Sequence, residues 1–128
     1  MSLDWRSWFI PGRPARKGPP ESLAEPAADD LDRIEELRQA GSKLNLPHPL
    51  RNFMVVPTEA AAQQGKDALG EEGFACTVRA LPDGRWMVTA VTRLVPRPGM
   101  VTRMREQVEA VAATLDGEYA GWESPLVY

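Results

Sequence analysis

The tripeptide Pro82-Asp83-Gly84 separates two apolar segments and dictates how they pair. Proline presets the first turn position and glycine accepts the left-handed one, as in a three-residue hairpin loop with a glycine bulge. This turn sets Leu81 opposite Arg85 and so predicts two antiparallel strands, Phe74–Ala80 and Arg85–Arg93. Because side chains alternate along a strand, one face then carries five residues. They are Cys76, Val78, Trp86, Val88 and Ala90.

The remaining segments complete an order of elements that is typical of one fold. The apolar run Arg51–Val56 predicts a buried strand, and Thr58 caps a helix that we expect to end near Glu72. Apolar residues at three- and four-residue steps predict a second helix over Gly99–Leu115. The stretch Gly117–Glu123 follows as the last strand. The resulting order is strand, helix, strand, strand, helix, strand.

This order predicts an α+β fold, a ferredoxin-like βαββαβ sandwich with a four-stranded antiparallel sheet and two helices on one face. Right-handed crossovers place the first and third strands in the centre. The open face presents an apolar patch of Met87, Thr89 and Val91, which we expect something to cover. The candidates are the Trp5/Trp8/Phe9 segment, the Leu31/Ile34/Leu37 helix and a second copy of the chain.

Two regions precede the ferredoxin-like domain, which we expect to span residues 49–128. Residues 1–28 are expected to form a proline-rich basic arm that is partly disordered, with its basic run at Gly12–Pro20. Residues 29–48 are expected to hold an extra N-terminal helix and a loop, with Asp29 or Asp30 as the helix cap.

The last strand holds the candidate partner-binding site. Strict alternation would separate Tyr119 and Trp122 onto opposite faces, and Gly121 between them is typical of a bulge or of a close approach by a ring. Two interpretations stay open: the aromatic residues close the core of a small domain, or they anchor a partner in a recognition strand. The candidate site comprises Glu118, Tyr119, Gly121, Trp122 and Glu123.

The residue types needed for catalysis or metal binding do not occur in suitable patterns. The only histidine, His48, lies between two prolines and is expected in a surface loop, while Cys76 is expected to be a small buried apolar residue. The chain has no zinc-ligand spacing and no calcium-loop pattern. The pairs Glu35-Glu36 and Glu71-Glu72 are interpreted as solvated helix faces. We therefore expect no catalytic residues, no metal, no cofactor and no enzyme activity.

Charge and composition argue against several classes of protein. A net charge of -3 and a pI near 5.2 disfavour binding to nucleic-acid phosphates. The expected open-face residues are also not the aromatic ones on which RNA-recognition domains stack bases. No stretch approaches the roughly 18 apolar residues of a membrane span. A single cysteine fits a reducing compartment, so we expect a cytoplasmic protein that does not contact membranes.

The chain resembles the regulator of ribonuclease activity B family over about residues 31–127. The ending Gly117-Glu118-Tyr119-Ala120-Gly121-Trp122-Glu123 is similar to the terminal motif of the family. The segments Asp83-Gly84-Arg85-Trp86 and Gly41-Ser42-Lys43-Leu44 resemble it as well. The resemblance implies a ferredoxin-like domain that binds a ribonuclease E-like endoribonuclease and restrains it, without enzyme activity or cofactor. Two alternatives stay open, namely a sheet-mediated dimer or small apolar-ligand-binding module, and a direct RNA-binding domain.

Overall fold

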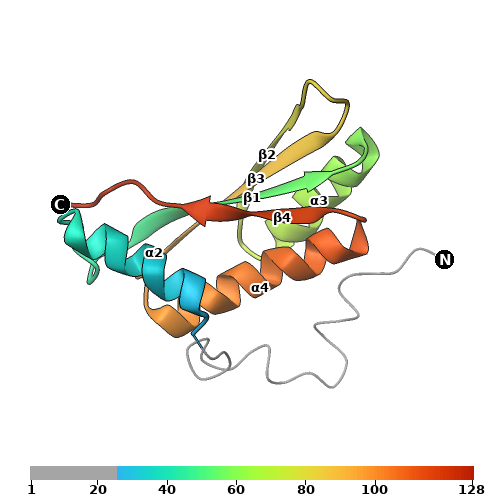
Figure 1. Cartoon of the computed structure of the whole chain (residues 1–128). Helices are drawn as coiled ribbons and strands as arrows, with labels where there is room; N and C mark the ends of the chain where they lie inside the picture. Colours follow the sequence, from blue (N-terminus) through green and yellow to red (C-terminus); the bar gives the residue numbers. More distant parts are fainter. Residues whose placement is uncertain (1–25) are drawn as a thin grey trace, which may run out of the picture.

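Four strands form one antiparallel sheet in the computed structural model, which describes residues 26–128 (Figure 1). The strand order β2-β3-β1-β4 confirms the predicted central pair and the predicted edges. The described part thus has the predicted α+β, ferredoxin-like architecture with one preceding helix. In chain order the elements are α2 (Ala28–Gln39), β1 (His48–Val56), α3 (Glu59–Glu71), β2 (Ala75–Ala80), β3 (Trp86–Leu94), α4 (Pro98–Thr114) and β4 (Glu118–Glu123).

The β2–β3 hairpin has the predicted register. The backbone N–H of Leu81 donates to the carbonyl of Arg85 at 2.7 Å, and Gly84 takes the left-handed conformation with φ 92°. Val78 pairs with Val88 across the hairpin, as side-chain alternation from this turn requires. The turn chemistry therefore determined the pairing.

Helices α3 and α4 pack on the same face of the sheet, and the core lies between the two layers (Figure 1). Thr58 caps α3 as predicted, since its hydroxyl accepts the N–H of Ala61. Gly65 lets α3 lie close to the sheet, because a Cβ at this position would collide with the Cε of Met54. Gly73 ends the helical region with φ 101°.

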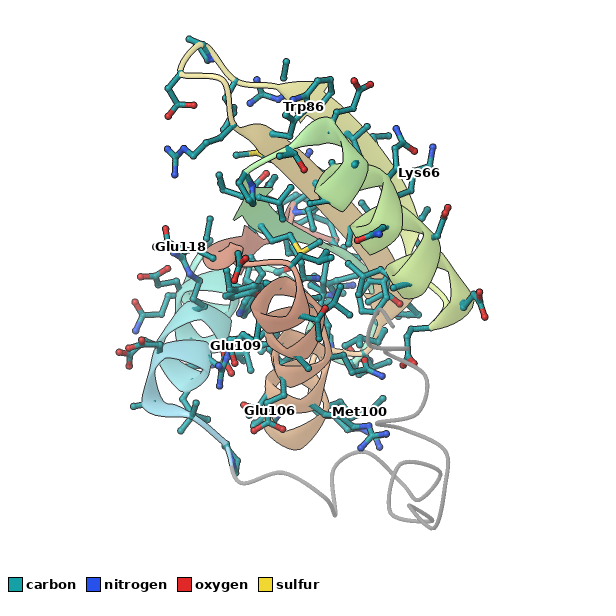
Figure 2. The ribbon with its side chains drawn as sticks, turned by 90° about the vertical axis from the view of Figure 1, so that its right-hand side faces the viewer. Lys66, Trp86, Met100, Glu106, Glu109 and Glu118 are labelled. Carbon is teal, nitrogen blue, oxygen red and sulfur yellow. The ribbon has the colours of Figure 1, made fainter. Side chains whose placement is uncertain are left out.

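Helix α2 lies on the helix side of the sheet, where α4 runs between α2 and α3 (Figure 2). It therefore does not cover the open face, and that candidate was wrong. Its buried side also differs from the prediction, since Leu31 is 42% exposed whereas Asp30 is only 1% exposed. Asp30 is not a helix cap either, because Ala27 occupies the cap position.

The other predictions on the N-terminal region and on the open face stay predictions. The Trp5/Trp8/Phe9 segment lies outside the described residues. A second copy of the chain as the cover of the open face stays a prediction. The same holds for the division of the chain at residues 28 and 48.

The expected surface position of His48 was wrong, because this histidine begins β1 and is fully buried. Its Nδ1–H donates to the carbonyl of Leu46 at 2.7 Å, and its Nε2 lies 2.6 Å from the Oγ of Ser42. The same Oγ accepts the backbone N–H of Val127 at 2.8 Å. A residue before proline favours extended backbone, so Pro49 supports an early start of the strand rather than a loop. His48 thus helps to hold the C-terminal segment against the domain.

Candidate functional site: a groove between α2, α4 and β4

An open groove of about 470 Å³ runs between α2, α4 and β4. A smaller hollow of about 180 Å³ continues it along α2, and the two share Arg33, Glu36 and Trp122 in their walls. The groove is lined by Ala27, Asp29, Asp30, Asp32, Arg33, Glu36, Arg105, Glu109, Tyr119, Gly121 and Trp122.

Four of the five predicted site residues line this surface. Tyr119, Gly121 and Trp122 belong to the groove, and Glu123 belongs to the smaller hollow. Glu118 is exposed on β4 and lines neither. Trp122 contributes from within the core, because only 4% of its surface is exposed.

A bulge in β4 brings the two aromatic residues to the same side of the sheet. Tyr119 pairs with Met54 and Gly121 pairs with Phe53, so Ala120 is an extra residue in β4. Gly121 has a φ of 110°, a backbone conformation that other residues rarely adopt. The assignment of Tyr119 and Trp122 to opposite faces was therefore wrong, whereas the bulge that Gly121 indicated is present.

Asp30 joins α2, α4 and β4 at the base of the groove. Its Oδ1 accepts the Nε1–H of Trp122 at 3.0 Å. Its Oδ2 accepts the hydroxyl of Thr102 at 2.7 Å and the Nε–H of Arg105 at 2.9 Å. One buried carboxylate thus satisfies three donors from two other elements, which orients the walls of the groove.

Tyr119 forms a second polar contact beneath the groove. Its hydroxyl donates to the Oδ1 of Asn52 at 2.9 Å, and the side-chain amide of Asn52 donates to the carbonyl of Ala90 at 3.3 Å. Burial raises the pKa of Tyr119, and the negative charge of Asp30 raises it further. The phenol therefore stays protonated and remains a hydrogen-bond donor near neutral pH.

Carboxylates outnumber cations along the groove. Arg105 bridges Asp30 and Glu109, the latter at 2.7 Å, and Figure 2 shows Glu109 on the side of α4 that faces α2. The other acids of the lining, Asp29, Asp32 and Glu36, form no ion pair with any residue between 26 and 128. This negative excess favours a cationic ligand.

The contribution of α2 to this surface was not predicted from the sequence. Asp29 or Asp30 was interpreted as the helix cap, and the pair Glu35-Glu36 as a solvated face. The spacing contained a signal, because Asp29, Asp32 and Glu36 recur at three- and four-residue steps and so share one side of a helix. That α4 and β4 oppose this side was not visible in the sequence.

The described residues offer no arrangement of three or more His, Cys, Asp or Glu side chains suited to a metal ion. Burial raises the pKa of the half-buried Cys76 to about 11, against the opposing effect of Lys66, so its thiol stays protonated at neutral pH. Among residues 26–128, no helix has the length and apolar character needed to cross a membrane.

Comparison with known proteins supports one family. A search of curated proteins found no match. A family model described as "Regulator of ribonuclease activity B" matches residues 27–124. The match includes every element that lines the groove, from α2 to β4. The chain belongs to the regulator of ribonuclease activity B family.

Proposed function

We propose that this protein binds a ribonuclease E-like endoribonuclease and inhibits it, and that it thereby modulates RNA processing and decay. Membership of the regulator family over residues 27–124 is the observation that carries this proposal. The protein acts by contact alone, without turnover of its own and without a cofactor. It works in the cytoplasm, where such an endoribonuclease meets its RNA substrates.

The groove and the adjoining β4 strand form the binding surface in this proposal. Tyr119, Gly121 and Trp122 contribute its β4 wall, while Glu118 and Glu123 are exposed on the same strand, Glu123 in an ion pair with Arg51. Such a surface suits a basic segment of the nuclease. Exposed charges of this kind accelerate the encounter more than they tighten the complex, so binding weakens as salt is added.

Side-chain contacts in the groove support the complex better than strand addition at the β4 edge. A bulge interrupts the regular spacing of backbone donors and acceptors, and natural proteins use bulges to prevent pairing at sheet edges. The bulge at Ala120 and Gly121 lies in the middle of β4. A partner strand would find only two short regular stretches there.

Direct RNA binding has less support from the geometry. The central strands β1 and β3 place Phe53, Val55, Met87, Thr89 and Val91 on the open face. Only Phe53 in this set is aromatic, whereas RNA-recognition domains use several aromatic residues to stack bases.

The test measures binding and cleavage with matched charge variants. A purified ribonuclease E-like endoribonuclease is titrated with this protein while cleavage of a fluorogenic RNA is recorded. The Asp32→Lys, Glu36→Lys variant should bind at least about ten-fold more weakly than the wild type, because it reverses the charge of the groove. The Glu59→Lys, Asp67→Lys variant is the control, since it makes the same change in charge on exposed positions of α3, beyond α4 (Figure 2).

The possible results test the proposed function and the proposed binding surface separately. Unchanged cleavage and no detectable complex at high molar excess would refute the proposed function. Inhibition that both charge variants retain in full would leave the function standing but refute the groove as its surface. Quenching of cleavage through RNA capture, detected by fluorescence anisotropy of the RNA without nuclease, would favour the RNA-binding alternative.

A further inference from the structure

A basic segment, Gly12–Pro20, precedes the groove in the chain, and the residues between them include Glu21 and Glu25. Ala27 lines the groove, and its backbone N–H donates to the hydroxyl of Thr102 at 3.1 Å, which anchors the start of α2. The preceding segment Gly12–Pro20 contains Arg13, Arg16 and Lys17 and no acidic residue. A basic segment is thus tethered at the rim of an acidic groove.

We propose that the segment Gly12–Pro20 binds in the groove of its own chain and competes there with the basic segment of a partner. Its three cations meet the carboxylates of Asp29, Asp32 and Glu36, which have no ion-pair partner among residues 26–128. Only the identity of the competing partner rests on the proposed function. Binding of the segment itself is a property of this chain alone.

The length of the intervening chain permits this contact. Lys17 precedes Ala27 by ten positions, and an extended proline-rich chain spans about 3.1 Å per residue, so the tether reaches about 30 Å. The 12 residues of α2 extend for only about 18 Å at 1.5 Å per residue. The basic segment can therefore fold back along all of α2. Its prolines restrict the free chain and so reduce the entropy that is lost on binding.

The groove suits this segment better than the open face of the sheet does. On the open face, β4 contributes two carboxylates, and that of Glu123 is already paired with Arg51, which leaves Glu118 opposite Val55. Arg79 adds a further positive charge at the β2 edge, next to Met87 on β3. A cationic segment thus gains less there than in the groove, which offers three carboxylates that form no ion pair with any residue between 26 and 128.

The competition should be modest and therefore regulatory. A short tether gives an effective concentration in the millimolar range. A segment with a dissociation constant of about 1 mM would occupy the groove at least about half of the time. Partner affinity would then fall by about two- to ten-fold, in proportion to the fraction of free groove.

The experiment uses the full chain with a spin label in the basic segment. A nitroxide is attached at Ala15→Cys in a Cys76→Ala background, and the ¹⁵N spectrum of the same chain is recorded. The label should broaden the signals of the Gly121 amide and the Trp122 indole N–H. The Asp32→Lys, Glu36→Lys variant should lose this broadening, and the Glu59→Lys, Asp67→Lys control should keep it.

A charge swap provides the second part of the test. Adding Arg13→Glu, Arg16→Glu and Lys17→Glu to the Asp32→Lys, Glu36→Lys chain should restore the broadening, because both partners then carry reversed charge. In a chain with the wild-type groove, replacing the same three cations with glutamine should increase the affinity for the nuclease by about two- to ten-fold.

Several results would overturn this proposal. One is broadening at Phe53 and Thr89, which would place the segment on the open face. Another is broadening of an unlabelled chain by a labelled one in a mixture, which would indicate contact between chains. The third is the absence of any broadening. None of them bears on the proposed function, because the measurement contains no nuclease. Conversely, failure to bind the nuclease would leave the intramolecular result intact.

Discussion

Replacing Asp30 with alanine removes an acceptor that three donors share. The donors are the indole N–H of Trp122, the hydroxyl of Thr102 and the guanidinium of Arg105, at 3.0, 2.7 and 2.9 Å. Trp122 and Thr102 are almost completely buried, so water cannot replace the lost acceptor. The side chain of Arg105 is 20% exposed and also contacts Glu109, so it keeps one partner.

The burial of each donor determines how much unfolding free energy the substitution should remove. A buried donor that loses its acceptor costs about 1–3 kcal/mol, and the two buried donors together suggest about 3 kcal/mol. The full penalty of about 3–5 kcal/mol for breaking a buried ion pair does not apply to Arg105, because Glu109 and solvent remain available. We therefore expect the free energy of unfolding to fall by about 3–4 kcal/mol. For a domain of about 100 residues, the melting temperature should fall by at least about 12 °C.

Urea denaturation followed by far-UV circular dichroism measures this change. Asp29→Ala is the matched control, since it removes the same charge from the same helical turn at an exposed position. Both variants lose a favourable charge at the start of α2, which is worth about 0.3–1 kcal/mol. The difference between their free energies of unfolding therefore reports the contribution of the buried contacts of Asp30.

A double-mutant cycle with Trp122→Phe assigns part of the loss to the indole. The phenylalanine keeps an aromatic ring but lacks the N–H donor, so the coupling energy should be about 1–2 kcal/mol. A loss below about 1 kcal/mol for Asp30→Ala, or no difference from Asp29→Ala, would refute the reasoning that this carboxylate joins the three elements.

Three further predictions concern packing, reactivity and binding. Gly117→Ala should destabilise the domain by about 1–3 kcal/mol, because the new Cβ would lie 2.8 Å from the carbonyl oxygen of Val55. Gly70→Ala, where the new Cβ meets open space, should be neutral or stabilise the domain by up to about 1 kcal/mol. Thermal melting of both variants measures these changes, and equal melting temperatures would contradict the prediction. Since burial raises the pKa of Cys76 to about 11 from an ordinary 9.0, alkylation at pH 8 should be about a hundred-fold slower than in urea, and mass spectrometry that shows equal rates would contradict this. Because the folded state disfavours the thiolate, Cys76 should also contribute a loss of stability as the pH rises from about 9 to 11. Glu118→Lys with Glu123→Lys should leave the melting transition in place yet weaken nuclease binding at low salt; equal affinity across salt concentrations would exclude these side chains from the interface.

Most of the fold could be predicted because its signals are local. The Pro82-Asp83-Gly84 turn determines the register of two strands, and the small residues around Gly65 indicate a helix that lies close to a sheet. The order of the elements then restricts the topology to one arrangement. The β4 motif likewise pointed to Tyr119, Gly121 and Trp122, three residues that line the groove.

Contacts between distant residues decided the rest. Asp30 and Trp122 are 92 positions apart in the chain, and no local pattern shows that a carboxylate in the first turn of a helix will accept an indole N–H. His48 is buried because Ser42 and Leu46 satisfy both of its ring nitrogens, and Ser42 in turn binds Val127. The sequence alone thus determined the elements and their order, since backbone propensity and side-chain periodicity act over a few residues. Only the tertiary structure decided which polar groups are buried and where the acidic groove lies, because burial of a polar group depends on partners that the chain brings together when it folds.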